Sequence, residues 1–250
     1  MPQNQRSLRL TDAYRRRLFA LRDELQRRAP DLWREPEQLA AMVETAQKAS
    51  LALTGAYLTA FLRSETGKVT RPIVLDTEAY SGSAADGQPL TEQMRSPLIG
   101  YLAARKKGEE SPERVAIDRA VRQVGMNYDA AHRKALSETI KDDERFSGGT
   151  RAVRGTCGAC AALSGTPHMD VHPNCQCVEE PKVSGVTQRI TRPTGTALFF
   201  AKTTEEQDAM VGPEAAEKLR TGQIAMADLI GESHLDSDAQ NFLTQAPVAQ

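Results

Sequence analysis

All four cysteines of this 250-residue chain lie in one short stretch, which runs from a C-x2-C motif to an H-x2-C-x-C motif. Two thiolates in a C-x2-C turn reach one tetrahedral metal ion, and a second knuckle of His and Cys completes the shell. The stretch is rich in turn residues and poor in large apolar side chains, so we expect metal or disulfides to hold it together. The candidate ligands are Cys157, Cys160, His172, Cys175 and Cys177.

Three chemistries fit these five candidates. A zinc ion takes four ligands, and the simplest set is Cys157, Cys160, His172 and Cys175, with Cys177 able to replace His172 or Cys175. Two disulfides are the second possibility, but they belong to oxidising compartments, and the polar start of the chain lacks the apolar segment of a secretory signal. Reduced, unpaired thiols are the third. Our prediction is a structural zinc site, because protein ligands can fill all four positions and no general base is placed nearby.

The charge of the chain is nearly balanced, with 32 basic and 33 acidic residues. This balance argues against a globally basic nucleic-acid binder, although not against a local basic patch. Aromatic residues make up only 5% of the chain, so its cores must be built from Ala, Leu, Val and Ile. No apolar run approaches the ~20 residues that a membrane span requires. The composition predicts a soluble, charge-rich and mainly helical protein with no membrane partner.

Apolar residues at spacings of three and four predict a first helix from about Thr11 to Arg28, preceded by disordered residues 1–9 and ended by Pro30. The other faces of this helix are basic. They are either solvated, or they contact DNA phosphates or an acidic partner surface. The basic residues are Arg15, Arg16, Arg17, Arg22, Arg27 and Arg28.

More long helices are predicted before the cysteine stretch. One begins at Pro36 and runs to about Arg63, with Gly67 closing it. A helical hairpin follows, with one arm over about 91–107, broken or restarted at Pro97, and a second arm over about 112–143. His132 lies near the apolar stripe of the second arm, where we expect a packing or surface residue rather than a catalyst.

The predicted fold class is mainly α: long N-terminal helices in a bundle or hairpins, then a small Cys/His-stapled α+β domain and a short helical tail. Residues 150–154 are expected to form a strand and 183–200 to be extended. Short helices are expected after Thr203 or Thr204 and over 214–220, with a last helical turn over 225–230. The predicted domains are a helical domain (1–146), a Cys/His-rich domain (147–192), a strand with short helices (193–231) and a loosely ordered polar tail (232–250).

The cysteine stretch resembles the phage head morphogenesis family, the Mu F-like minor capsid proteins of tailed bacteriophages. The likeness rests on Cys157-Gly158-Ala159-Cys160, on Leu163 and Gly165, and on His172-Pro173-Asn174-Cys175-Gln176-Cys177, where Gln176 stands in place of the usual Arg. The tail resembles the ending of the same family. It carries Phe199, Glu206-Gln207, Val211-Gly212, Leu219, Thr221-Gly222 and Asp228-Leu229-Ile230. The likeness covers about residues 145–231, and the long helical front is similar to the versions found in phages of actinobacteria.

This resemblance implies a structural protein inside the phage head near the portal, made in the host cytoplasm and linked to head assembly and to the packaged DNA or its exit. The implied partners are the portal protein and capsid or scaffold components. We expect no enzyme, because the G-x-S-x-G and H-E-x-x-H motifs are absent and the residues of the cysteine stretch are better explained as ligands. The alternative hypothesis is a zinc-stapled nucleic-acid-binding protein whose Arg-rich first helix contacts phosphates.

Overall fold

The computed structural model describes residues 3–68, 71–152, 177–187, 195–225 and 229, and these residues are mainly helical with one small two-stranded sheet. The chain divides into two compact units. The first comprises residues 1–147 and 183–186, and the second comprises 148–182 and 187–250. None of the described helices is long and apolar enough to cross a membrane.

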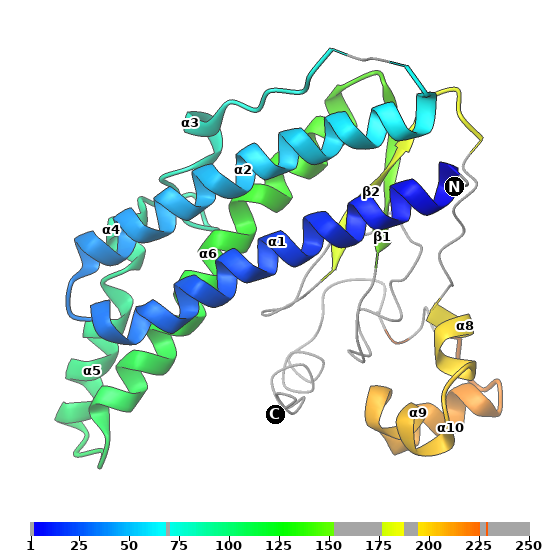
Figure 1. Cartoon of the computed structure of the whole chain (residues 1–250). Helices are drawn as coiled ribbons and strands as arrows, with labels where there is room; N and C mark the ends of the chain where they lie inside the picture. The colour runs from blue at the N-terminus through cyan, green and yellow to red at the C-terminus, as the bar shows by residue number, and fades with distance from the viewer. Residues whose placement is uncertain (1–2, 69–70, 153–176, 188–194, 226–228, 230–250) are drawn as a thin grey trace. The chain divides into compact units, whose positions relative to one another are not determined.

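Three long helices build the first unit: α1 (Gln3–Leu32), α2 (Pro36–Thr66) and α6 (Pro112–Asp142), each of which packs against the other two (Figure 1). Their facing sides form an apolar core, in which the rings of Tyr14 and Tyr57 stack with centroids 4.3 Å apart. The largest of the fully buried apolar residues in this core are Leu18, Leu39, Leu51, Leu58, Phe61, Leu62, Tyr128 and Leu136.

The first helix is longer than the sequence predicted. Residues 3–9 are helical rather than disordered, because polar side chains tie this end to α2. The hydroxyl of Ser7 contacts the side chains of Ser64 and Glu65, and Thr11 hydrogen-bonds Tyr57. Apolar periodicity carries no signal for such polar contacts.

The prediction that Pro30 ends the first helix is also wrong, since Pro30 lies inside α1. A proline removes one backbone donor from a helix but does not oblige the next residues to leave it. Trp33, directly after the helix, is buried, with its ring tilted against that of Tyr101 and the guanidinium of Arg34 at 4.0 Å from the ring centroid. These contacts fix the turn into α2.

The other helix boundaries in the first unit follow the sequence closely. Gly67 closes α2 with a left-handed φ of 68°, donating its N–H to the carbonyl of Arg63 at 3.0 Å, as predicted. The predicted hairpin is present, and its first arm is divided, close to the predicted break at Pro97, into α4 (Leu90–Gln93) and α5 (Ser96–Lys106). A short helix that the pattern did not predict, α3 (Thr77–Tyr80), begins at Asp76, whose carboxylate accepts from two backbone N–H groups.

Helices α1 and α6 approach closely at Gly125. A Cβ atom placed there would lie 2.8 Å from the side-chain nitrogen of Gln26 and 3.2 Å from Nε of Arg22. The missing side chain therefore lets the polar side chains of α1 reach the backbone of α6, and Gln26 donates to the carbonyl of Val121. This approach positions Arg22 for the ion pair described below.

The sheet consists of β1 (Phe146–Ala152) and β2 (Val178–Val183). The N–H of Ser184 donates to the carbonyl of Arg145, while Gly149 lies against Glu179 further along, so the two strands run antiparallel. The strand expected over 150–154 therefore begins earlier, at Phe146, and residues 153–154 lie outside the described part of the chain.

Three short helices follow in the second unit: α8 (Gly195–Phe200), α9 (Thr204–Val211) and α10 (Pro213–Arg220). The start of α9 is as predicted, because Thr203 and Glu206 form a reciprocal capping box. The expectation that 183–200 is extended is wrong for residues 195–200, which form α8. The apolar run Ala197–Phe200 is too short for its periodicity to distinguish a strand from a helix.

Candidate functional site

Of the five candidate metal ligands, only Cys177 belongs to the described part of the chain. Cys157, Cys160, His172 and Cys175 lie outside it. Cys177 directly precedes β2 and is 1% exposed. Among the described residues, no three or more His, Cys, Asp or Glu side chains gather as a group that could hold a metal ion.

The strand after Cys177 is buried although its sequence is polar. Val178, Glu179 and Glu180 are all almost inaccessible to solvent. A side chain at Gly149 of β1 would collide with the side chain of Glu179 in β2. The glycine therefore leaves room for this glutamate where the two strands pair. Sequence pattern did not predict this burial, because two adjacent glutamates are usually a sign of exposure.

The second described group of residues surrounds the three short helices of the second unit. Phe199 is fully buried and packs with Val211 and Leu219. Met210 and Ala216 complete the buried cluster, and Ala215, Ile224 and Leu229 pack against it. The three short helices thus share one apolar core.

Gln207 connects the turns of this tail through its amide. Its Nε2 donates to the carbonyls of Phe199 (3.2 Å) and Lys202 (3.1 Å), while its Oε1 accepts from Arg220 (3.3 Å). Arg220 also pairs with Asp208 at 2.8 Å. The glutamine is 6% exposed, so these hydrogen bonds satisfy a polar group that would be costly to bury alone.

The predicted basic face of the first helix divides into two sets. Arg15 and Arg22 are buried, so assigning them to a solvated or DNA-contacting face was wrong. Arg15 pairs with Asp12 at 2.8 Å. A signal in the sequence was available, because Arg22 lies four residues after Leu18 and three before Leu25, in phase with the apolar stripe. Arg16, Arg17, Arg27 and Arg28 are exposed as predicted.

A buried ionic cluster joins α1 to α6. Nη1 of Arg22 lies 3.4 Å from Oδ2 of Asp129, and Nη2 of Arg133 lies 3.8 Å from the same oxygen. The side chains of Arg22 and Asp129 are only 5% and 10% exposed. Sequence analysis missed Asp129 and Arg133, because one helix at a time gives no sign that opposite charges meet across an interface.

His132 is buried beside this cluster, as a packing residue, with its ring tilted against that of Tyr128 at 5.4 Å. No described residue hydrogen-bonds its Nδ1. Burial, assisted by the positive charges of Arg133 and Arg22, lowers the pKa of His132 to about 3. The imidazole is therefore neutral in the folded protein at any pH near neutrality.

Acidification should consequently destabilise the first unit through His132. Below a pH of about 6.5 the unfolded chain binds a proton that the folded chain rejects, so stability falls as the pH drops from about 6.5 toward 3. Between pH 7 and pH 5 this amounts to about 2 kcal/mol. Urea unfolding at each pH should show the wild type losing that much more than the variant His132→Phe, which keeps a ring against Tyr128. Parallel pH curves for the two proteins would contradict the assignment.

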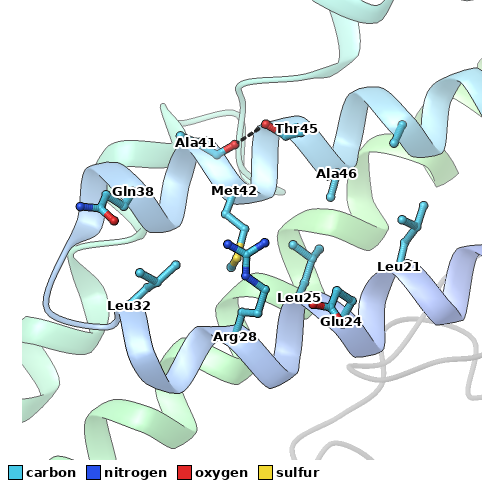
Figure 2. A pocket seen from close by; sticks show the side chains of 11 residues that line it. Leu21, Glu24, Leu25, Arg28, Leu32, Gln38, Ala41, Met42, Thr45 and Ala46 are labelled. Carbon is cyan, nitrogen blue, oxygen red and sulfur yellow. Dashed lines mark hydrogen bonds between the residues drawn. The ribbon is translucent and has the colours of Figure 1, made fainter.

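A groove of about 510 Å³ lies between the second half of α1 and the first half of α2 (Figure 2). Leucines of α1 form one wall, and small residues of α2 form the other. The groove exists because the alanines of α2 do not fill the space opposite the leucines. The lining residues are Leu21, Glu24, Leu25, Arg28, Leu32, Gln38, Ala41, Met42, Thr45, Ala46 and Ala49.

In comparisons with protein-family models, curated proteins and solved structures, no match to this chain is found.

Proposed function

We propose that this chain is a structural minor capsid protein of a tailed bacteriophage, placed inside the head near the portal. The observation that supports the proposal is the tail. Phe199, Val211 and Leu219, which are part of the tail's resemblance to the family, pack in one small core, and Gln207 bonds the turns around it. The family-like residues thus act together as a folding unit, as the signature of a structural module should.

The proposed partners are the portal protein and capsid or scaffold components, with packaged DNA as a further contact. The chain is made in the host cytoplasm and ends in the virion. We propose no catalytic role, because the proposal uses only the helices, the small apolar core of the tail and a structural metal site. Its task in this proposal is to hold other components of the head in place during assembly, DNA packaging or DNA exit.

Density-gradient fractionation of phage-producing cells tests this proposal. The chain is expressed from its native gene context, and each fraction is probed for the chain and for DNA. We expect the chain to travel with capsid-sized particles, both empty and DNA-filled. Its confinement to the light fractions, with normal particles elsewhere in the gradient, would reject the capsid assignment.

We further propose that the cysteine stretch binds one structural zinc ion through four of the five residues Cys157, Cys160, His172, Cys175 and Cys177. Thiolates with an imidazole are the donor set that structural zinc sites use. The burial of Cys177 fits a closed site that has no position for substrate. The ion would supply folding energy and no chemistry.

Replacing Cys175 should therefore release the metal and destabilise one region only. For Cys175→Ser, we expect less than one zinc ion per chain by elemental analysis. Relative to the wild type, hydrogen exchange should become at least tenfold faster over residues 150–182 and should change little over residues 1–144. The matched control Ala159→Ser adds the same hydroxyl without removing a thiol, and it should keep both zinc and protection. Equal acceleration in both regions would contradict a separately stapled unit, and zinc-free wild type without reactive thiols would favour disulfides.

A further inference from the structure

Six exposed basic side chains extend along the outside of the first unit from α1 to the end of α2. We call them the basic strip: Arg6, Arg9, Arg16, Arg17, Arg63 and Lys68. The four arginines of α1 fall on one side of the helix at 100° per residue, opposite the side that carries the buried Tyr14, Leu18 and Leu25. Arg6 and Arg9 belong to the segment predicted to be disordered, and the sequence pattern gives no sign that Arg63 or Lys68 lies near them.

The contact between the two helices brings the two groups of basic residues close together. Ser7 of α1 contacts Ser64 and Glu65 of α2, so Arg6 and Arg63 flank the same point of contact. Arginines of the first helical turns thus lie beside basic residues at the end of the second helix. Arg6 to Arg17 alone cover about 16 Å of helix axis.

Nearby acidic groups already have partners within the chain. Asp12 pairs with Arg15, and the carboxylate of Glu65 contacts the hydroxyl of Ser7. None of the six basic side chains forms an ion pair with any residue of the described ranges. The whole chain carries a formal charge of −1, so this surface is a local separation of charge rather than a general excess.

The remaining arginines of α1 do not belong to the strip. Arg27 pairs with Glu24 at 2.6 Å, and Arg28 lines the groove between α1 and α2. Arg15 and Arg22 are buried. The strip therefore occupies the first half of α1, whose one acidic residue, Asp12, is already paired with Arg15.

The chemistry of the strip fits a phosphodiester backbone. Five of its six residues are arginines, whose planar guanidinium groups bind phosphate oxygens with two hydrogen bonds. One strand of duplex DNA presents a phosphate charge per about 3.4 Å of the axis, so a strip about 16 Å long can follow about five phosphates of one strand. A membrane surface is disfavoured, because Tyr14, Leu18 and Leu25 of α1 are buried and no large apolar side chain of this helix is fully exposed beside the arginines.

We propose that the basic strip binds the phosphate backbone of duplex DNA without reading its sequence. The choice of DNA rests on the proposed function, since a protein inside a filled head is surrounded by packaged duplex. The strip itself rests only on the placement of its residues. No side chain of the strip is positioned by its neighbours for base contacts, so we expect affinity to depend on salt and not on base sequence.

Fluorescence anisotropy with the full-length protein and labelled 20-base-pair duplexes tests this proposal. The test variant replaces Arg6, Arg9, Arg16 and Arg17 with glutamine. The matched control removes the same charge from exposed residues of the α5–α6 hairpin: Arg105, Lys106, Lys107 and Arg114. Circular dichroism confirms that both variants fold.

For the wild type, we expect the logarithm of the association constant to fall linearly with the logarithm of salt concentration, with a slope of about −4. The strip variant should reduce the slope by about 3 and weaken binding at least tenfold at low salt. The control variant should retain most of the affinity, and two duplexes of unrelated sequence should bind alike. Equal losses in both variants, or a wild-type slope near zero, would overturn the proposal.

Competition separates DNA from an acidic protein partner. Excess poly-glutamate should displace labelled duplex poorly compared with unlabelled duplex, and equal displacement would assign the strip to an acidic protein face instead. The outcome is independent of the fractionation experiment. If the chain travels with capsids but does not bind DNA, the proposed function stands and the DNA-binding role of the basic strip is rejected. If the chain binds DNA but stays outside capsids, the DNA-binding role stands and the proposed function is rejected.

Discussion

Replacing Asp129 with asparagine is expected to lower the free energy of unfolding of the first unit by about 3 kcal/mol, because the change leaves buried arginines without their carboxylate. Asp129 lies 3.4 Å from Arg22 of α1 and 3.8 Å from Arg133 of α6. Asparagine has nearly the same volume, so the core stays filled while the negative charge is lost. In thermal unfolding, the loss corresponds to a midpoint lower by about 10 °C.

Asp118 offers a matched control on the same helix, since it is exposed. Asp118→Asn makes the same chemical change where water solvates both side chains, and we expect an effect within about 0.5 kcal/mol. If Asp129→Asn were as mild as Asp118→Asn, the cluster between α1 and α6 would not stabilise the fold. A double variant, Asp129→Leu with Arg22→Met, should recover part of the lost stability, because it removes the carboxylate together with its most buried partner and leaves only Arg133, which is more exposed than Arg22.

Replacing Gln47 with leucine is expected to cost about 3 kcal/mol as well, for a different reason. Gln47 is fully buried in α2 and connects the 81–89 loop to α6. Its Nε2 donates to the carbonyls of Ser83 (3.1 Å) and Asn127 (2.9 Å), and its Oε1 accepts from the N–H of Gly82 (3.0 Å). Leucine fills the volume but leaves these buried polar groups without a partner, and each loss of this kind costs about 1–3 kcal/mol.

Gln38→Leu is the control for this change, because Gln38 lies on the exposed side of the same helix. It should alter the urea midpoint by little. Hydrogen exchange gives a second measurement: Gln47→Leu should expose the amides of Gly82 and Ala85, since Ala85 donates to Asn127, which Gln47 contacts. Unchanged protection of both amides would show that Gln47 does not hold the loop.

The main helices were predictable because their signals are local. Pro36, Gly67 and Pro112 mark ends that backbone geometry favours whatever the rest of the chain does. The same reasoning failed at Pro30, which is compatible with a helix once neighbouring residues are anchored. It also failed at residues 3–9, where contacts with a distant helix decide the structure.

In the tail, too, helix ends with local signals were predictable, and elements that depend on distant contacts were not. Thr203 and Glu206 predict the start of α9, because a capping box forms between two residues that are only three positions apart in the sequence. The helix over 195–200 was not predictable in this way. Phe199 is buried by residues of α9 and α10, so its helical state depends on partners that come later in the chain.

For the surfaces that we propose to be functional, the sequence indicated candidate residues but not which of them are exposed. Counting arginines indicated a basic helix, yet pairing with Asp12 and Asp129 removes Arg15 and Arg22 from its surface. Conversely, Arg63 joins the strip only through the contact of α1 with α2. For the cysteine stretch, spacing supplied five candidate ligands, and only the burial of Cys177 is known from the described part of the chain.

The location that we propose for this protein, inside the head of a tailed bacteriophage, can be tested on purified, DNA-filled particles that are treated with a protease and analysed by quantitative mass spectrometry. We expect a few copies per particle, whose exposed 105–111 turn is cut only after the heads have been opened. Absence of the chain from purified particles, or its cleavage in intact heads as fast as that of exterior proteins, would show that the protein does not lie inside the head.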